Sequence, residues 1–566
     1  MKNKNYIRIC CLFILVSDFI FSATSNPEYG RNGMVVSTSI QASQAGIQIL
    51  KKGGNAIDAA VAVGFALAVT SSGNGNIGGG GFLIARFSNG TSIALDHREK
   101  APLKAHSNMF LNDSGSVIRG MSLFSRASSG VPGTVDGLIR AFKNHGSGKI
   151  SLREILNPAI RLAERGFELS HFEANRLNAY KTFFEKNKAA SKIFIRDNGK
   201  PWEKGHILIQ KDLAKTLKRI ARYGRDGFYS GTVAQLIIEE MKRGNGLITM
   251  QDLLSYESKY RVPVLGTYKG HNIISMGPPS SGGALLVNML NMLENYPMDT
   301  LGWNSSGYVH LLTEVERRAY ADRAEHMGDP DFWDVPISML TSKDYAKNRI
   351  KNINLDVATL SSDISASKKV LYETDETTHY SVVDRWGNAV SVTTTINLNY
   401  GNGCVVEGAG FFLNNEMDDF SSKPGVPNAF GLIGNEANAI QASKRPLSSM
   451  TPTIVLKDRK PFLIIGSPGG STIITTTLQT ILNVVHHDMD IKEAVCAPRF
   501  HSQWMPDVIQ YEPRSLIKDL KQALEIKGHK LVERGGYIGE ANGIMILEDG
   551  YYGGGDCRGE TSAIGY

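Results

Sequence analysis

The sequence predicts one compact α/β body in which helices and strands are mixed along the whole chain. Helical periodicity and strand-like alternation each recur three times, at 152–165, 213–221 and 308–324 for helices and at 262–268, 379–395 and 453–465 for strands. A length of 566 residues would allow about three or four domains. No Pro-rich or Gly/Ser-rich linker divides these elements, so we expect a single body.

The amino terminus has the pattern of a secretory signal peptide over residues 1–25. Three basic residues precede an apolar run at 9–21, and small residues follow at Ala23 and Ser25. The run is too short for a comfortable membrane span, and Asp18 lies inside it. We therefore expect an exported protein, periplasmic or secreted, with no stable membrane span.

The composition of the remaining chain excludes some classes of protein. Without residues 1–25 it holds 59 basic and 54 acidic residues, a net charge of +5, and the basic residues are scattered along the sequence. A nucleic-acid partner is not expected. Cys404, Cys496 and Cys557 remain, which is enough for at most one disulfide and not for a disulfide framework.

The first elements are a helix and a hairpin. Residues 55–69 are apolar on nearly every side, which predicts a buried helix. The following loop has glycines in the G-x-G-x-x-G spacing, but a helix precedes it and a strand at 81–87 follows, the reverse of a dinucleotide site. Ser88-Asn89-Gly90 predicts a turn into a second strand at 91–95, and strands 379–395 and 453–465 are each expected to turn, at 385–388 and 457–460.

The polar segment 352–376 is rich in Ser, Asp and Lys. Taken alone it reads as an exposed loop, and such a loop is also where a chain can be cut and its new ends can separate. Thr377 follows it and opens a strand. If the bond after Glu376 is cut, the Thr377 hydroxyl lies beside its own free amine, whose pKa of about 7.7 to 8 suits a general base. Thr378 is the rival nucleophile.

Several further motifs have ordinary explanations when taken singly, such as solvated loops, helix caps and turns. They are Asn76 to Phe82, Asp96 to Pro102, Pro278 to Gly283, Thr395-Ile396-Asn397, Asn414 to Asp419, Arg445 to Met450 and Gly466 to Ser471. In this order and spacing the chain resembles the γ-glutamyltransferase (γ-glutamyl transpeptidase) family of the N-terminal-nucleophile hydrolases, from about Gly46 to Ala563, most strongly from Thr377 to Ser471.

The resemblance implies a four-layer αββα sandwich and an enzyme that cuts itself before Thr377. The products would be a large subunit, 26–376, and a small catalytic subunit, 377–566, which together form one compact heterodimer. The γ-glutamyl group of glutathione, glutamine or related compounds would pass through an ester on Thr377 to water, an amino acid or a peptide. The resemblance implies no metal and no organic cofactor; His486-His487-Asp488 lacks a matching ligand set and is expected to be a surface helix end.

The resemblance also implies roles for single residues. Thr395 would orient the nucleophile. Arg98, Ser448 and Ser449 would bind the α-carboxylate of the γ-glutamyl group, with a guanidinium suited to bidentate pairing. Asn397, Glu416 and Asp419 would accept from its α-ammonium, and the Gly469 and Gly470 amides, at the start of a helix, would stabilise the oxyanion.

Segment 424–434 matches the lid loop of the bacterial members that have one. They usually have tyrosine where this chain has Phe430, so a lid hydrogen bond is in doubt. Two alternatives stay open: a related acylase acting on glutaryl β-lactams, whose substrate lacks the ammonium, and a non-catalytic secreted binding protein. The presence of Glu416, Asp419 and Asn397, which suit an ammonium, argues against the acylase. The presence of Thr377, Thr395 and the Gly469-Gly470 pair argues against a non-catalytic protein.

Overall fold

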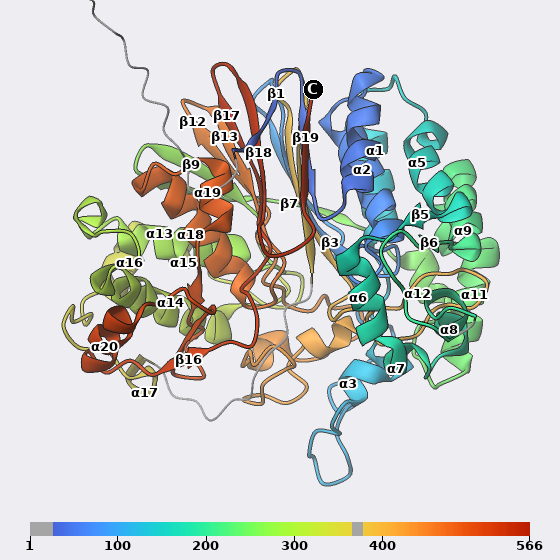
Figure 1. The fold of residues 1–566 in the computed structure, drawn as a ribbon. Coiled ribbons are helices and arrows are strands. Elements are labelled where there is room, and N and C mark those ends of the chain that lie inside the picture. Colours follow the sequence, from blue (N-terminus) through green and yellow to red (C-terminus); the bar gives the residue numbers. More distant parts are fainter. Residues whose placement is uncertain (1–25, 198, 365–376) are drawn as a thin grey trace, which may run out of the picture.

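Two seven-stranded sheets form the centre of the protein (Figure 1). The computed structural model describes residues 26–197, 199–364 and 377–566, so the expected signal peptide and Glu376 lie outside the described residues. Sheet A consists, in order, of β1 (Glu28–Gly30), β18 (Gly550–Gly555), β17 (Asn542–Leu547), β13 (Lys460–Ile465), β12 (Thr453–Lys457), β9 (His271–Ser275) and β8 (Val264–Tyr268). Sheet B consists of β19 (Ser562–Gly565), β2 (Met34–Ser37), β10 (Thr378–Val383), β11 (Ala389–Thr395), β3 (Gly80–Arg86), β4 (Ser92–Asp96) and β7 (Lys259–Arg261).

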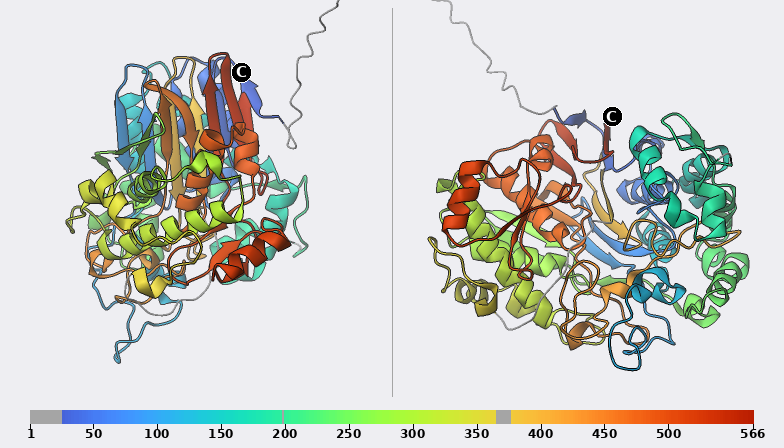
Figure 2. Two further views of the ribbon diagram at one scale, coloured as in Figure 1. Left: turned by 90° about the vertical axis from the view of Figure 1, so that its left-hand side faces the viewer. Right: turned by 60° about the horizontal axis from the view of Figure 1, so that its bottom comes forward.

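Helices cover the outer face of each sheet, which gives the four-layer αββα sandwich (Figures 1 and 2). The layer on sheet B contains α1 (Ile40–Lys51), α2 (Ala56–Thr70), α4 (Thr134–His145), α5 (Leu152–Arg165), α9 (Lys211–Tyr223) and α11 (Gly231–Lys242). The layer on sheet A contains α13 (Gly282–Leu293), α14 (Ser306–His326), α18 (Thr472–His486) and α19 (Ile491–Cys496).

Smaller elements surround these layers. The remaining helices are α3 (Met121–Phe124), α6 (His171–Ala179), α7 (Lys181–Phe184), α8 (Lys188–Phe194), α10 (Asp226–Tyr229), α12 (Met250–Ser255), α15 (Ile337–Leu340), α16 (Lys343–Arg349), α17 (Ser361–Ile364) and α20 (Lys518–Ile526). Short strands β14 (Phe500–His501), β15 (Ile509–Tyr511) and β16 (Leu531–Glu533) form a third sheet, and β5 (Phe167–Glu168) pairs with β6 (Ile207–Leu208).

Alternation along the strands divides the apolar side chains among three core layers. In β3, Phe82 and Ile84 point between the sheets, whereas Leu83 and Ala85 point into the helices of the sheet B side. In β13, Ile464 lies between the sheets and Ile465 packs under the helices of the sheet A side. The period of two in the sequence therefore fills the layers on both faces of each sheet.

The predicted elements are confirmed, with shifts of a few residues at their ends. The buried helix expected at 55–69 is α2, which begins at a capping box between Asn55 and Asp58. Helix α5 has the predicted bounds, and the two later hairpins are β10–β11 and β12–β13. Within the described ranges, no helix combines the length and apolarity needed to cross a membrane.

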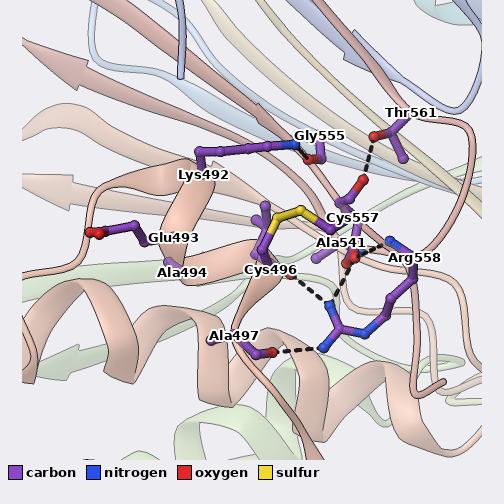
Figure 3. The surroundings of a disulfide bond; sticks show 12 residues. Lys492, Glu493, Ala494, Cys496, Ala497, Ala541, Gly555, Cys557, Arg558 and Thr561 are labelled. Atoms are coloured by element: carbon purple, nitrogen blue, oxygen red, sulfur yellow. Dashed lines mark hydrogen bonds and ion pairs between the residues drawn. A yellow bond between two sulfur atoms is a disulfide. The ribbon is translucent and has the colours of Figure 1, made fainter. Parts of the chain in front are cut away.

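Cys496 and Cys557 form a disulfide, and Cys404 is free and buried (Figure 3). The disulfide joins the last residue of α19 to the loop between β18 and β19. Beside it, Arg558 donates to the backbone oxygens of Val495 (3.0 Å) and Ala497 (2.7 Å). The bond therefore fastens the connection between the two sheets to the outer helices of the sheet A side.

Candidate active site

A small pocket lies where the central hairpin of sheet B ends. Strands β10 and β11 are antiparallel with Thr378 opposite Thr394, so the start of one and the end of the other meet at the same edge. Thr377 immediately precedes β10, and Thr395 ends β11; both line the pocket. The loops after β4, β11 and β13 bring in the other predicted residues: Arg98, Asn397, Glu416, Asp419, Phe430, Ser448, Ser449 and Gly470 all line it.

Thr377 and Thr378 differ in what their side chains contact. The Thr378 hydroxyl forms a hydrogen bond of 2.8 Å with the Thr38 hydroxyl and does not line the pocket. Thr377 lines the pocket and is 5 % exposed. The Thr395 hydroxyl accepts from the Asn397 amide at 2.9 Å. Because adjacent side chains of a strand point to opposite faces, only the first threonine has access to the pocket.

Arg98 is held rigidly on the loop after β4. Its amide donates to Asp96 (3.0 Å), its Nε donates to the Pro446 oxygen (3.2 Å), and the side chain is fully buried. Its two Nη atoms bind Glu416 Oε1 and Asp419 Oδ2. Arg98 is thus the cation that these two carboxylates bind here, which the sequence analysis did not anticipate.

The electrostatics around Arg98 are unbalanced. Glu99 Oε2 lies 3.7 Å from Arg98 Nη1, so three carboxylates surround one guanidinium. Burial raises the pKa of Glu416 well above its ordinary value, despite the opposing effect of Arg98. Burial likewise raises the pKa of Glu99 to about 7. The raised pKa values mean that this cluster holds protons near neutral pH, and a further cation bound beside it would favour the ionised carboxylates.

Three buried polar atoms of the pocket have no hydrogen-bond partner among the described residues: Asn397 Oδ1, Glu416 Oε2 and Ser449 Oγ. Asn397 is fixed in the left-handed region (φ 72°), and its Nδ2 donates to the Asn415 oxygen at 2.9 Å. Buried polar groups are normally satisfied, so unpaired ones in a pocket indicate where a ligand binds. Two acceptors and one hydroxyl suit a ligand that carries both an ammonium and a carboxylate.

Of the two glycines that precede α18, Gly470 lines the pocket, whereas Gly469 is not among the lining residues. Gly469 has φ 138° and Gly470 has φ 54°, both in a region that side chains disfavour. Gly470 lines the pocket, and a Cβ there would lie 2.5 Å from the Phe430 ring. Helix α18 begins without a side-chain cap, and the positive end of its dipole is directed at the pocket.

Phe430 closes one side of the pocket and is 4 % exposed. Its backbone oxygen accepts from Gln503 Nε2 at 3.2 Å, and its amide donates to Asn428 Oδ1 at 3.0 Å. The preceding amide, Ala429, donates to Asp418 at 2.8 Å. Segment 424–434 therefore lies over the pocket, fastened by backbone hydrogen bonds that do not depend on the aromatic ring.

Four further residues line the pocket: Leu432 and Met450, which lie within segments singled out in the sequence, and Arg323 and Ile473, which belong to none of the predicted motifs. Arg323 is on α14, is 4 % exposed, and its Nε donates to the Ser281 hydroxyl at 3.0 Å. Ser281 in turn donates to the Ser448 oxygen at 2.8 Å. The Pro278 to Gly283 motif was the one signal in the sequence that could have indicated this contact.

A network behind the glycine pair connects it to the disulfide. Asp556, next to Cys557, accepts from Arg499 Nη2 (2.7 Å) and from the Ala541 amide (2.6 Å). The neighbouring Glu540 amide donates to Ser467 Oγ at 3.0 Å. Ser467 precedes Pro468-Gly469-Gly470, so these contacts connect the disulfide loop to the backbone that carries the two glycines.

Within the described ranges, one group of side chains has the spacing of a metal site: His310, Glu314 and His529. Its ring nitrogens already have protein partners, since His310 bonds His529 (2.7 Å) and the Asn354 oxygen (2.8 Å). Arg317 lies against both Glu314 (3.0 Å) and His529 (3.4 Å). His486 instead bonds Tyr268 (2.6 Å) and Asp299 (2.8 Å) at the end of α18. We assign a metal to neither place.

Comparison with known proteins agrees with this geometry. The family model described as Gamma-glutamyltranspeptidase matches residues 42–566. The glutathione hydrolase proenzyme of Escherichia coli (strain K12) is 45 % identical over 99 % of this chain and 98 % of its own length. The acylase ACY 1 proenzyme of Pseudomonas sp. (strain SE83) is 35 % identical, over 95 % and 94 %. The crystal structure of the cephalosporin acylase from Bacillus halodurans has the same fold, with a TM-score of 0.83 at 24 % identity over 98 % and 99 %.

Proposed function

Because the chain belongs to the γ-glutamyltranspeptidase family, we propose that it is a self-processing γ-glutamyltransferase with glutathione hydrolase activity. It cleaves γ-glutamyl bonds of glutathione, glutamine and related compounds. The γ-glutamyl group passes through an ester on Thr377 to water, an amino acid or a peptide. No step of this reaction needs a cofactor.

One observation supports this proposal: three buried polar atoms of the pocket have no partner among the described residues, and they suit the two charges of an amino acid head group. Glu416 Oε2 and Asn397 Oδ1 are acceptors without partners among the described residues, and they suit the α-ammonium together with Asp419. The Ser449 hydroxyl is unpaired there too, and with Ser448 and the Arg98 guanidinium it suits the α-carboxylate. A compound lacking either charge leaves buried groups unpaired, which costs binding free energy.

The chemistry follows from the position of Thr377. Cleavage after Glu376 frees its amine, which takes the proton of the adjacent hydroxyl while the oxygen attacks the γ-carbonyl. Thr395 orients the nucleophile, and the Gly469 and Gly470 amides bind the oxyanion. Loss of one such donor typically lowers kcat by about 10² to 10³. The amine then protonates the leaving amine, and water or an acceptor resolves the ester by the same route.

The acylase alternative is weaker. The acylase ACY 1 proenzyme is 35 % identical to this chain, against 45 % for the glutathione hydrolase proenzyme. A glutaryl group has no ammonium, so it would leave the buried Glu416 Oε2 and Asn397 Oδ1 without a partner. A non-catalytic binding protein would have no use for Thr377 and Thr395 at one edge of the sheet.

The lid, Phe430 at its centre, governs which acceptor resolves the ester. A closed lid limits water and helps to hold an acceptor amine. Phenylalanine keeps the apolar contact with Gly470 but offers no hydroxyl. Without the hydroxyl contact the lid is expected to be looser, so water should resolve most of the ester, and transfer should rise when acceptor is abundant.

Export is also part of the proposal, and the mature protein is periplasmic or secreted. The amino-terminal pattern over 1–25 supports it, and so does the disulfide, since such bonds persist in oxidising compartments and are rare in the cytosol. The mature protein would consist of residues 26–376 and 377–566, held together as one body.

A denaturing gel with amino-terminal sequencing of the smaller band tests the proposal. Mature protein should give bands of about 39 and about 21 kDa, taking about 110 Da per residue for the two spans, and the smaller band should begin at Thr377. Thr377→Ala should give one uncut, inactive chain. Thr378→Ala is the matched control and should still be cut, because its hydroxyl bonds Thr38 away from the pocket. Correct cleavage of Thr377→Ala would refute the assignment.

A further inference from the structure

The outer faces of α5 and α9 carry an excess of positive charge. The two helices hold eight basic side chains and three acidic ones, a net charge of +5, whereas the whole chain has a net charge of +7. They lie against one another in the outer helical layer (Figure 1). The basic residues are scattered along the sequence, and the packing of α5 on α9 gathers some that are more than 50 positions apart.

A groove runs between the two helices, with apolar Ile160 and Ala221 in its lining and arginines along it. We call it the basic groove, defined by Arg153, Arg161, Arg165, Lys218 and Arg222. Lys218 pairs with Glu164. Among the described residues, none of the four arginines has a carboxylate within ion-pair distance. Arg161 has only a long hydrogen bond to Gln48 (3.4 Å), and Arg222 lies over the Tyr223 ring at 5.0 Å.

The acidic residues of the two helices are used locally and do not neutralise the arginines. Glu154 caps the start of α5 through Ser151, and Asp212 pairs with Lys215 within α9 (2.8 Å). Four exposed, unneutralised guanidinium groups along one groove are an arrangement that binds phosphate groups, since each guanidinium can make two parallel hydrogen bonds to phosphate oxygens.

Exposed apolar side chains border the basic groove. Ile207 and Ile209 are 47 % and 43 % exposed and pack against Gly166, directly after Arg165. Tyr223, next to Arg222, is 55 % exposed. Basic residues that bind lipid phosphates, beside apolar and aromatic residues that enter the headgroup region, are the composition of a surface that binds membranes.

We propose that the basic groove and its apolar border dock the protein on an anionic phospholipid surface. The arginines bind lipid phosphates, and Ile207, Ile209 and Tyr223 enter the interface. A nucleic acid is less suited, because aliphatic Ile207 and Ile209 cannot stack on bases. The groove lies on the outer helix layer, whereas the pocket opens at an edge of sheet B, so docking leaves the pocket open to substrate.

The test compares two quadruple variants of the mature protein with the same change in charge. The first is Arg153→Gln, Arg161→Gln, Arg165→Gln and Arg222→Gln. The matched control neutralises four exposed lysines elsewhere, Lys347→Gln, Lys351→Gln, Lys460→Gln and Lys518→Gln. Sedimentation with vesicles of equal parts phosphatidylglycerol and phosphatidylcholine, at about 0.15 M salt where the Debye length is about 8 Å, measures the partition coefficient.

Wild type should bind these vesicles and not pure phosphatidylcholine. The groove variant should lose at least about tenfold in partition coefficient, since each basic residue near an anionic surface contributes severalfold, and the control should lose less than about twofold. All three proteins should hydrolyse a soluble γ-glutamyl anilide equally, which shows that the fold is intact.

Four results would overturn the proposal. Absence of wild-type binding excludes docking. An equal loss in both variants means that net charge alone acts. Displacement from vesicles by inorganic phosphate at constant ionic strength means that the groove binds a single phosphate. Tighter binding of a duplex DNA probe than of vesicles means that the partner is a nucleic acid.

Discussion

Replacing Arg98 by lysine tests how the pocket recognises its substrate. The guanidinium bonds Glu416 through one Nη and Asp419 through the other while Nε holds the Pro446 oxygen. A lysine ammonium is a compact charge that cannot span the same partners in one geometry. At least one charge-assisted hydrogen bond is lost, which costs about 1.5 to 3 kcal/mol, and a buried carboxylate is left partly unpaired, so that the total is about 2 to 5 kcal/mol.

At 1.36 kcal/mol for each factor of ten, kcat/KM for a γ-glutamyl anilide should fall by about thirtyfold to a few thousandfold. Self-cleavage should remain, because Arg98 is assigned to the substrate and not to the Thr377 bond. Glu416→Gln and the double variant complete a double-mutant cycle. The double variant should lose less than the sum of the two single losses, because each single change removes the same ion pair.

An unchanged kcat/KM in Arg98→Lys would refute the role given to Arg98, since the α-carboxylate of the substrate would then be bound by other residues. Additive losses in the cycle would also contradict it, because they would mean that Arg98 and Glu416 act independently. Circular dichroism and the two-band gel distinguish these outcomes from a failure to fold.

Three other predictions follow from the described contacts. Phe430→Tyr should raise the ratio of γ-glutamyl-acceptor product to free glutamate when a dipeptide acceptor is present, and an unchanged ratio would remove the role given to the missing hydroxyl. Burial lowers the pKa of His379 to about 3, because the folded protein favours the neutral ring. The contribution of this ring to the free energy of unfolding is therefore complete above its ordinary pKa of about 6.5. It is lost as the pH falls from there toward 3, at about 1.4 kcal/mol per pH unit. In thermal unfolding, the difference in free energy of unfolding between wild type and His379→Gln should therefore decrease by about 1.4 kcal/mol for each pH unit below 6.5. Equal pH dependence of the two proteins would contradict this assignment. The double variant Cys496→Ser/Cys557→Ser opens a loop with a sequence separation of 61, which should lower the free energy of unfolding by up to about 4 kcal/mol. It should also lower kcat more than it changes KM, and Cys404→Ser serves as the control. A normal kcat in the double variant would disprove the link between the disulfide and the glycine pair.

The strand and helix pattern was predictable because it depends on local periodicity, as the agreement at α2 and α5 shows. The choice between Thr377 and Thr378 was less predictable, since both lie at the start of the strand. Only the hydrogen bond between Thr378 and Thr38 shows that the Thr378 side chain points away from the pocket. Thr38 lies more than 300 residues away in the sequence, and no local pattern relates it to Thr378.

The other misses have the same cause. Arg323 is a basic residue on a helix, and nothing in its neighbours shows that α14 directs it into the pocket. The pairing of Arg98 with Glu416 and Asp419 joins residues more than 300 positions apart, and the motifs assigned them to different charges of the substrate. The basic groove exists only because α5 and α9 pack together. Motif spacing identifies the members of a site, whereas their contacts are set by long-range packing.

The strand order has a consequence for the two pieces that cleavage would produce. In sheet B, β10 and β11 of residues 377–566 lie between β2 and β3 of the other piece, and in sheet A, β12, β13, β17 and β18 lie between β1 and β9. Neither fragment has a complete sheet without the other, so separating them means unfolding both. The processed protein should therefore unfold as if it were one uncut chain. Dilution should not dissociate the two fragments, and they should unfold in one thermal transition. Either fragment expressed alone should not reach the native fold.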